Sequence, residues 1–325
     1  MSDPVTRHLG HGIATIPIPL PFPRLRWVNS YILEADDGLV VIDVGVDDDL
    51  SWQAFTGGLV LLGYRPEDVD VLVGSHLHVD HVGMASRVVD ALGPDFVMHR
   101  SALERLPGYD DFDGFFRRME VMARRHGVTP DELAEVTHPE PRPAWWPAGA
   151  EPNHPVDDGD TIRLSGDRRL AVVHTPGHDA SHIVLADSKT GVVFSGDHVL
   201  PRITPVVLND DDGGDSLGAF MDSLTRCQTL MSGLTLPAHG APIERGGERA
   251  RQLRLHHQRR LRDVEDALHV PATAWAVTKN VFAPHLVGID ARLALRETLA
   301  HLIHLELTGR VRRFEQGGVT WFRLP

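Results

Sequence analysis

The sequence predicts an α/β protein that ends in a small α+β region. Up to about residue 245, short β-branched runs alternate with turns and a few helices. From about Gly246 onward, three helical stretches precede two short strands that flank the turn at 315–318. Helices followed by a two-stranded ribbon favour a winged-helix-like arrangement. We therefore predict a larger domain over residues 1–245 and a winged-helix-like domain over 246–325.

Composition places the chain among ordinary globular proteins. It has 325 residues, 42% hydrophobic and 24% charged, a length that suits two domains. Its single cysteine, Cys227, excludes an internal disulfide, and the first ten residues lack the features of a secretory signal. No apolar run approaches the roughly 20 residues that a membrane span needs. We expect a cytoplasmic protein with no membrane association.

Charge is distributed unevenly along the chain. The net charge is −13, and the first 243 residues carry 18 Lys and Arg against 36 Asp and Glu. From Glu244 to the end there are 14 basic residues against nine acidic ones. The front part is therefore expected to repel a polyanion, whereas the rear part tolerates one.

Several strands and helices of the front part can be placed. Tyr31–Glu34 and 39–44 flank an Asp-Gly turn and predict a hairpin. The run 69–74 is almost wholly apolar, as in a strand covered on both faces. After it, 82–92 has helical spacing and stops at Gly93. Further strands are predicted at 161–164, 170–174, 183–186 and 192–195.

An insertion of about residues 102–156 interrupts these strands. It contains predicted helices at 112–126 and 129–136, the second opened by a capping box of Thr129 and Glu132. A proline-rich stretch at 139–155 follows and includes Trp145 and Trp146. An insertion of this size is typical of a lid or pocket wall, so we predict that role for it.

Potential metal ligands follow the ends of several strands. Four of them stand within six residues directly after the strand at 69–74, and three more come just after later strands. Such groups packed at one strand terminus would repel one another or leave donors unsatisfied unless a cation lay between them. Imidazole and carboxylate together suit zinc, iron or manganese rather than calcium. The candidate ligands are His76, His78, Asp80, His81, His178, Asp197 and His239.

At these residues the chain resembles the metallo-β-lactamase superfamily of metal-dependent hydrolases. The similarity covers roughly Ile13 to Ile243 and rests on Asp43 after the run LVVI and on the segments HLHVDH, TPGH, SGDH and AHG. The resemblance implies a four-layer αββα sandwich with two metal ions at one edge of its sheets. It implies that His76, His78 and His178 bind one metal, that Asp80, His81 and His239 bind the other, and that Asp197 bridges them.

The resemblance also implies a reaction. Two divalent ions, zinc by preference over iron or manganese, lower the pKa of a shared water, and the resulting bridging hydroxide attacks the substrate. Asp80 orients that water or accepts its proton, and Asp43 holds the ligand loop by hydrogen bonds. His198 and Arg202, just after the bridging ligand, are candidate catalytic residues that meet an anionic or carbonyl substrate.

Three functions stay open at this point. The first is hydrolysis of a small acyl substrate, a thioester, lactone or other ester. The second is an endoribonuclease or phosphodiesterase, since β-lactamase-like endoribonucleases have the same seven ligands. The third is DNA binding through the winged-helix-like domain, whose helix at 290–307 offers Arg292 and Arg296. Ser181 stands where the family pattern TPGHTxGH has glycine, and the larger side chain narrows the ligand loop. A homodimer also stays open.

Overall fold

The computed structural model describes residues 4–22, 24–137, 141–146 and 149–325. These residues form two compact units that alternate along the chain. The first unit comprises residues 1–110, 143–205 and 226–250, and the second comprises 111–142, 206–225 and 251–325. None of the helices in the described ranges combines the length and apolarity that crossing a bilayer requires. The predicted domain boundary at residue 245 stays a prediction.

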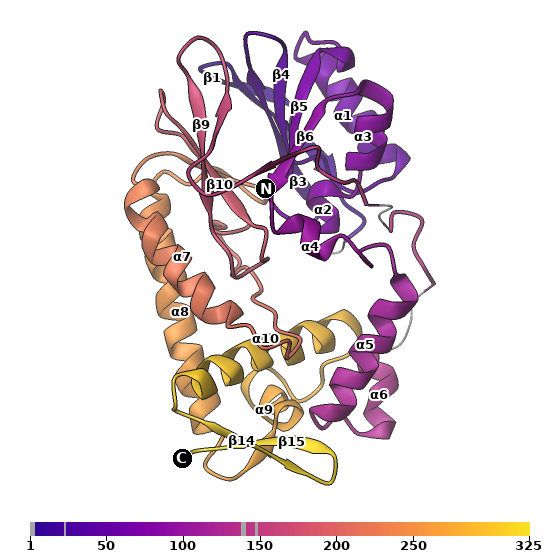
Figure 1. Ribbon diagram of the computed structural model, residues 1–325, viewed down its shortest axis with the longest axis vertical. Coiled ribbons are helices and arrows are strands. Elements are labelled where there is room, and N and C mark those ends of the chain that lie inside the picture. The colour runs from indigo at the N-terminus through magenta and orange to yellow at the C-terminus, as the bar shows by residue number, and fades with distance from the viewer. Residues whose placement is uncertain (1–3, 23, 138–140, 147–148) are drawn as a thin grey trace. The chain divides into compact units, whose positions relative to one another are not determined.

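The first unit contains a seven-stranded mixed sheet whose strand order follows the chain (Figure 1). Its first four strands are antiparallel, and the next three join in parallel. The predicted hairpin around the Asp-Gly turn is confirmed as β3 and β4. The strands are β1 (Arg7–Gly10), β2 (Ile13–Pro19), β3 (Trp27–Glu34), β4 (Leu39–Ile42), β5 (Val69–Val73), β6 (Asp95–His99) and β7 (His154–Val156).

A second, five-stranded sheet has the order β12-β11-β10-β9-β8. Its strands pair antiparallel except at β11 and β12, which are parallel. Four of these strands lie where the sequence predicted them, within one residue at either end. The strands are β8 (Thr161–Arg163), β9 (Arg169–His174), β10 (Ile183–Asp187), β11 (Val193–Gly196) and β12 (Thr235–Pro237).

Two apolar cores separate the layers of this unit. One contains Phe55 and Val88 from helices and Ile16 from β2, so it lies between helices and the seven-stranded sheet. The other contains Leu33 of β3 and Val172 of β9, so it lies between the two sheets. This is the expected αββα arrangement. The helices here are α1 (Asp49–Leu61), α2 (Val79–Val82), α3 (Ala85–Leu92) and α4 (Ala102–Arg105), with a 3-10 turn at Pro66–Asp68.

The predicted helix at 82–92 is interrupted. It is divided into α2 and α3 at Gly83 and Met84, and it ends as predicted at Gly93, whose φ is +74°. A Cβ on Gly83 would lie 2.3 Å from the Val79 carbonyl oxygen and 3.0 Å from the Val46 Cα. The break therefore permits a close backbone approach behind the candidate ligands.

The second unit is a small α+β assembly. α10 (Gly288–Leu307) packs against α6 (Pro130–Thr137) and α9 (Ala274–Val281), and α5 (Phe112–Arg125) packs against α6. A three-stranded sheet has the order β13-β15-β14, from Ala272–Thr273, Val319–Arg323 and Arg312–Gln316. Two further helices, α7 (Ser216–Leu230) and α8 (Gly246–Asp266), include the points where the chain passes from one unit to the other. Residues 138–140 and 147–148 of the predicted proline-rich stretch lie outside the described residues.

Candidate metal centre

The candidate ligands nearest the N-terminus follow a buried strand. β5 ends at Val73, and His76 and His78 lie in the short loop that leads into α2. His78 is the N-cap of α2, so Asp80 and His81 fall in its first turn. The loop is covered, since His76 and His81 are both fully buried. Four candidate ligands thus project from one loop and one helical turn.

The other three ligands follow strands of the second sheet. His178 comes after β9, Asp197 after β11 and His239 after β12. Gly196, just before Asp197, has a φ of +49°, and its carbonyl accepts a 3.0 Å hydrogen bond from the Ala238 amide. Parallel pairing of β11 with β12 brings their carboxyl ends to one edge, where Asp197 and His239 meet.

The structure brings all seven predicted ligands together. They form three overlapping groups, and within each group one ligand atom per residue lies within 4.8 Å of the others. The separations match those of atoms that share a metal ion, since tetrahedral bonds of about 2.1 Å place ligands roughly 3.4 Å apart. Asp197 belongs to the middle group, as expected of a bridging residue. The groups are His76, His78 and His178; His76, His81 and Asp197; and Asp80, His81 and His239.

Carboxylates and imidazoles of the centre approach one another closely. Nε2 of His239 lies 3.3 Å from Asp80 and 3.5 Å from Asp197. Nε2 of His81 lies 3.7 Å from both of these carboxylates. Nε2 of His76 lies 3.0 Å from Nδ1 of His78. These atoms therefore face a common space.

Hydrogen bonds behind the ligands fix their orientation. Asp43 accepts from the amide and the hydroxyl of Ser75, each at 2.8 Å, and from Nδ1 of His81 at 2.8 Å. The Ser75 oxygen, having donated to Asp43, accepts from Nδ1 of His76 at 3.0 Å. With Nδ1–H engaged on both rings, the Nε2 lone pairs of His76 and His81 point into the centre. The predicted supporting role of Asp43 agrees with this geometry.

A second set of bonds holds His239 and the strand before it. Nδ1 of His239 donates to the Trp27 carbonyl at 2.7 Å. The Tyr31 hydroxyl and the Asn29 amide both donate to the Pro237 carbonyl, at 2.8 and 3.0 Å. The buried Tyr31 therefore links β3 to the end of β12.

His182 supports the bridging position, a role that the sequence did not reveal. Its Nε2 accepts from the Asp197 amide at 3.0 Å, so its Nδ1 carries the proton and donates to the Thr175 hydroxyl at 2.8 Å. The ring is fully buried. The sequence signal that pointed toward the centre is the family pattern TPGHTxGH, whose final histidine falls at this position.

Burial and neighbouring charge divide the histidines into two kinds. Burial and the surrounding rings hold the pKa of His76 well below its ordinary value and lower the pKa of His78 to about 4. Burial alone would also lower the pKa of His81 and His239, but Asp80 and Asp197 raise both. His76 and His78 are thus neutral donors ready for a metal, whereas the other side of the centre attracts positive charge.

In the part of the chain that the structure describes, three buried polar atoms of the centre lack hydrogen-bond partners and indicate a bound cation. Nε2 of His81, Nε2 of His239 and Oδ1 of Asp197 are buried, and within the described residues they have no hydrogen-bond partner. Buried polar atoms are normally satisfied, so a cation among these three is the simplest partner. The five imidazoles and two carboxylates fit a dinuclear site.

The other residues singled out from the sequence lie elsewhere. His198 is fully buried, with its ring centroid 5.9 Å from that of His182, and Arg202 is exposed. Neither belongs to the three ligand groups, and their catalytic roles stay predictions. Trp145 packs edge-on against Phe22, with ring centroids 5.2 Å apart.

Two family models match the chain. The model of the metallo-beta-lactamase superfamily matches residues 24–239, which include all seven ligands. The model of the metallo-beta-lactamase-like C-terminal domain matches residues 261–325.

Individual proteins agree with these matches. A probable metallo-hydrolase of Bacillus subtilis, YqjP, is 25% identical over 324 residues, 96% of this chain and 97% of that protein. The human acyl-coenzyme A thioesterase MBLAC2 is 29% identical over 184 residues, 53% of this chain and 58% of that protein. A solved metallo-beta-lactamase family protein from Thermus thermophilus is 28% identical with a TM-score of 0.79, covering 98% of this chain and all of that one. With the seven ligands gathered at the edge of an αββα sandwich, the chain belongs to the metallo-beta-lactamase superfamily and is a metal-dependent hydrolase.

Proposed function

We propose that the protein hydrolyses a small acyl compound, with a thioester as the preferred substrate. The observation that carries the proposal is the pair of ligand groups on either side of Asp197, which suits two metal ions. The human relative is an acyl-coenzyme A thioesterase, which supports the thioester over other acyl compounds. Lactones and other esters share the reacting carbonyl and are the nearest alternatives.

The chain's own residues prepare the reaction. Bound in these groups, two divalent ions, zinc by preference, would make water acidic enough to attack a carbonyl at neutral pH and would polarise that carbonyl. Asp80 accepts or orients the proton of the attacking water, since its carboxylate lies beside His239 and His81. Burial alone would raise the pKa of Asp80, but those two rings outweigh it and lower the pKa, so Asp80 is ionised at neutral pH. Asp43 and Ser75 keep the rings aimed while this happens.

The experiment that tests the proposal is a hydrolysis assay on metal-loaded protein. Purified protein with two equivalents of zinc, iron or manganese is offered an acyl-coenzyme A, an aryl ester, a lactone and single-stranded RNA. We expect release of free thiol from the acyl-coenzyme A, loss of that activity after chelation, and its loss in His178→Ala. His154→Ala serves as the matched control, because His154 is an exposed histidine of the same unit outside the ligand groups.

Two results would overturn the proposal. Thioester hydrolysis that persists at full rate in His178→Ala would separate the activity from this centre. Cleavage of RNA with no hydrolysis of any acyl substrate would favour the endoribonuclease alternative instead.

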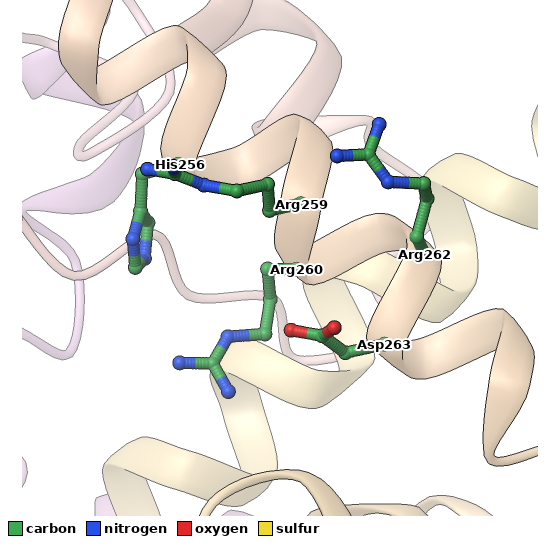
Figure 2. Close-up of a pocket in the computed structure, with 5 residues that line it drawn as sticks. All are labelled: His256, Arg259, Arg260, Arg262 and Asp263. Carbon is green, nitrogen blue, oxygen red and sulfur yellow. The ribbon is translucent and has the colours of Figure 1, made fainter.

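Charge placement argues for the acyl substrate over a polyanion. Helix α8 has a hollow lined by His256, Arg259, Arg260, Arg262 and Asp263 (Figure 2). Figure 2 shows that Arg262 points away from Arg260, whereas the Asp263 carboxylate extends toward the side of Arg260. The arginine side chains point in different directions and share the hollow with the Asp263 carboxylate. A phosphate-binding site instead directs several cationic groups at one point.

The proposed DNA-reading helix is also occupied by internal contacts. In α10, Arg296 forms a bidentate ion pair with Asp210, and the Arg292 guanidinium lies over the Phe116 ring at 5.4 Å from its centroid. A recognition helix instead presents its polar side chains to base edges. These contacts favour a structural role for α10 over DNA binding.

A further inference from the structure

A second cluster of potential metal ligands lies in the other compact unit. Glu297 and His301 stand four residues apart on α10, a spacing that places both side chains on one face of the helix. His257 reaches the same point from α8. One ligand atom from each residue lies within 4.8 Å of the other two. All three residues belong to the second unit, so the cluster is distinct from the metal centre at the sheet edge.

The hydrogen bonds of His301 orient it as a metal ligand. Its Nδ1 lies 2.7 Å from the Glu297 carbonyl oxygen and therefore carries the proton that it donates there. The Nε2 lone pair consequently faces Nδ1 of His257, with which it forms a 3.4 Å hydrogen bond that a bound metal ion would replace. A proton held on a backbone carbonyl is the usual support of a histidine that binds a metal through its other nitrogen. The separation of 3.4 Å is about that of two ligands on a tetrahedral zinc ion.

The cluster is buried. The side chains of His257 and His301 are fully buried, and Glu297 is partly buried. The nearby Arg260 donates to the Val281 carbonyl at 3.0 Å and lies over the Phe282 ring.

We propose that His257, Glu297 and His301 bind one further divalent cation, with zinc the best match, and that this ion fastens α8 to α10. Two imidazoles and one carboxylate are a donor set that zinc accepts, with water as the fourth ligand. The site is structural, because it joins two helices of the second unit and lies outside the hydrolytic centre.

The test counts metal ions in a chain whose hydrolytic centre has been disabled. In full-length protein carrying His178→Ala, Asp197→Ala and His239→Ala, we expect one equivalent of Zn²⁺ to bind by calorimetry. Tetrahedral Co²⁺ absorption should appear on titration with Co²⁺. Adding His301→Gln should weaken zinc binding at least about tenfold, since even indirect supports of a ligand contribute that much. His269→Gln is the matched control, an exposed histidine of the same unit, and should leave binding unchanged.

A near-isosteric substitution distinguishes loss of the metal site from loss of the fold. Glu297→Gln keeps the shape of the side chain and removes its charge, so it should weaken zinc binding in a protein with an unchanged circular dichroism spectrum. The proposal is overturned if the disabled chain binds no zinc. It is also overturned if His301→Gln, Glu297→Gln and His269→Gln all bind zinc equally, because adventitious binding by surface histidines would then explain the signal. Neither outcome depends on the substrate of the hydrolytic centre.

Discussion

Asp43 accepts a 2.8 Å hydrogen bond from Nδ1 of His81, although Asp43 itself has a φ of +60°. This left-handed conformation is uncommon for residues other than glycine. It coincides with a position from which one carboxylate reaches both His81 and Ser75. The strained residue therefore controls the aim of two candidate ligands.

Replacing Asp43 tests that control. Asp43→Asn retains the size of the side chain and removes its charge, so His81 loses its charged acceptor. We expect zinc affinity to fall by about 10- to 100-fold. Competition with a chromophoric chelator measures the affinity, and Asp37→Asn, at an exposed position, is the control. An unchanged affinity would mean that Asp43 is merely part of the fold.

Asp197 should be needed for both metals. Asp197→Ala removes the carboxylate that faces His81, His178 and His239 at 3.5–3.7 Å. We expect bound metal to fall below one equivalent at the hydrolytic centre and kcat/KM to fall by roughly 10²- to 10³-fold. Elemental analysis and a thiol-release assay measure the two effects. The exposed Asp167→Ala should match the wild type in both, and equal metal content in Asp197→Ala would refute a bridging role.

Gly196 sets the backbone that presents Asp197. A Cβ there would lie 2.7 Å from Nε2 of His182, the atom that accepts a hydrogen bond from the Asp197 amide. The φ of +49° also disfavours any residue other than glycine. Gly196→Ala should destabilise the protein by roughly 2 kcal/mol, with part of the loss from backbone strain.

Gly191→Ala is the control that separates backbone strain from the steric contact with His182 expected in Gly196→Ala. Gly191 has a φ of +70°, but nothing lies within 4 Å of its Cβ position. It should lose only about 1 kcal/mol, and its zinc affinity should stay at the wild-type level. Urea denaturation compares the two variants, and similar losses of stability and metal in both would contradict the proposed crowding of His182.

Glu132 should make the second unit sensitive to acid. It accepts from Thr129 at 2.9 Å, from Trp275 at 2.9 Å and from Lys279 at 2.7 Å. Burial alone would raise its pKa, but these donors outweigh burial and lower the pKa to about 2. Because the folded value is lower than the unfolded one, the stabilisation is complete above about pH 4.5 and is lost as the pH falls toward 2.

The variant Glu132→Gln isolates this contribution. It should reduce the free energy of unfolding by about 1 kcal/mol at pH 7 and by much less at pH 3. Urea denaturation with chelator present measures both values, so that metal release does not interfere. Glu151→Gln, at an exposed residue, is the control. A constant difference between the two pH values would exclude the ionised carboxylate as the cause.

The ligands were predictable because each follows a strand end. Apolar runs that stop at His76, His178 or Asp197 indicate both the strand and the edge where its polar side chains gather. The supports behind them were harder to find, since Trp27 contributes only a backbone carbonyl, and no side-chain pattern marks a carbonyl. Thr175 and His182 likewise become meaningful only when β9 and β10 pair.

Some elements were missed for identifiable reasons. Helix α1 contains the adjacent Gly57 and Gly58, which lower helix propensity, yet Gly58 is buried where a Cβ would lie 2.6 Å from Ile16. Strand β2 contains Pro17 and Pro19, but β1 pairs with it only as far as Thr15, so the prolines lie beyond the ladder on that side. Tertiary packing decided both elements.

The ligand loops of the first unit follow strands of two different sheets, so bound metal ions would connect those sheets. His76 follows a strand of one sheet and His239 a strand of the other, far apart along the chain. With Cys227 as its single cysteine, the protein has no covalent means of cross-linking those sheets. A bound pair of metal ions would be a reversible cross-link between the two sheets. The metal ions that activate water would then also hold the layers together.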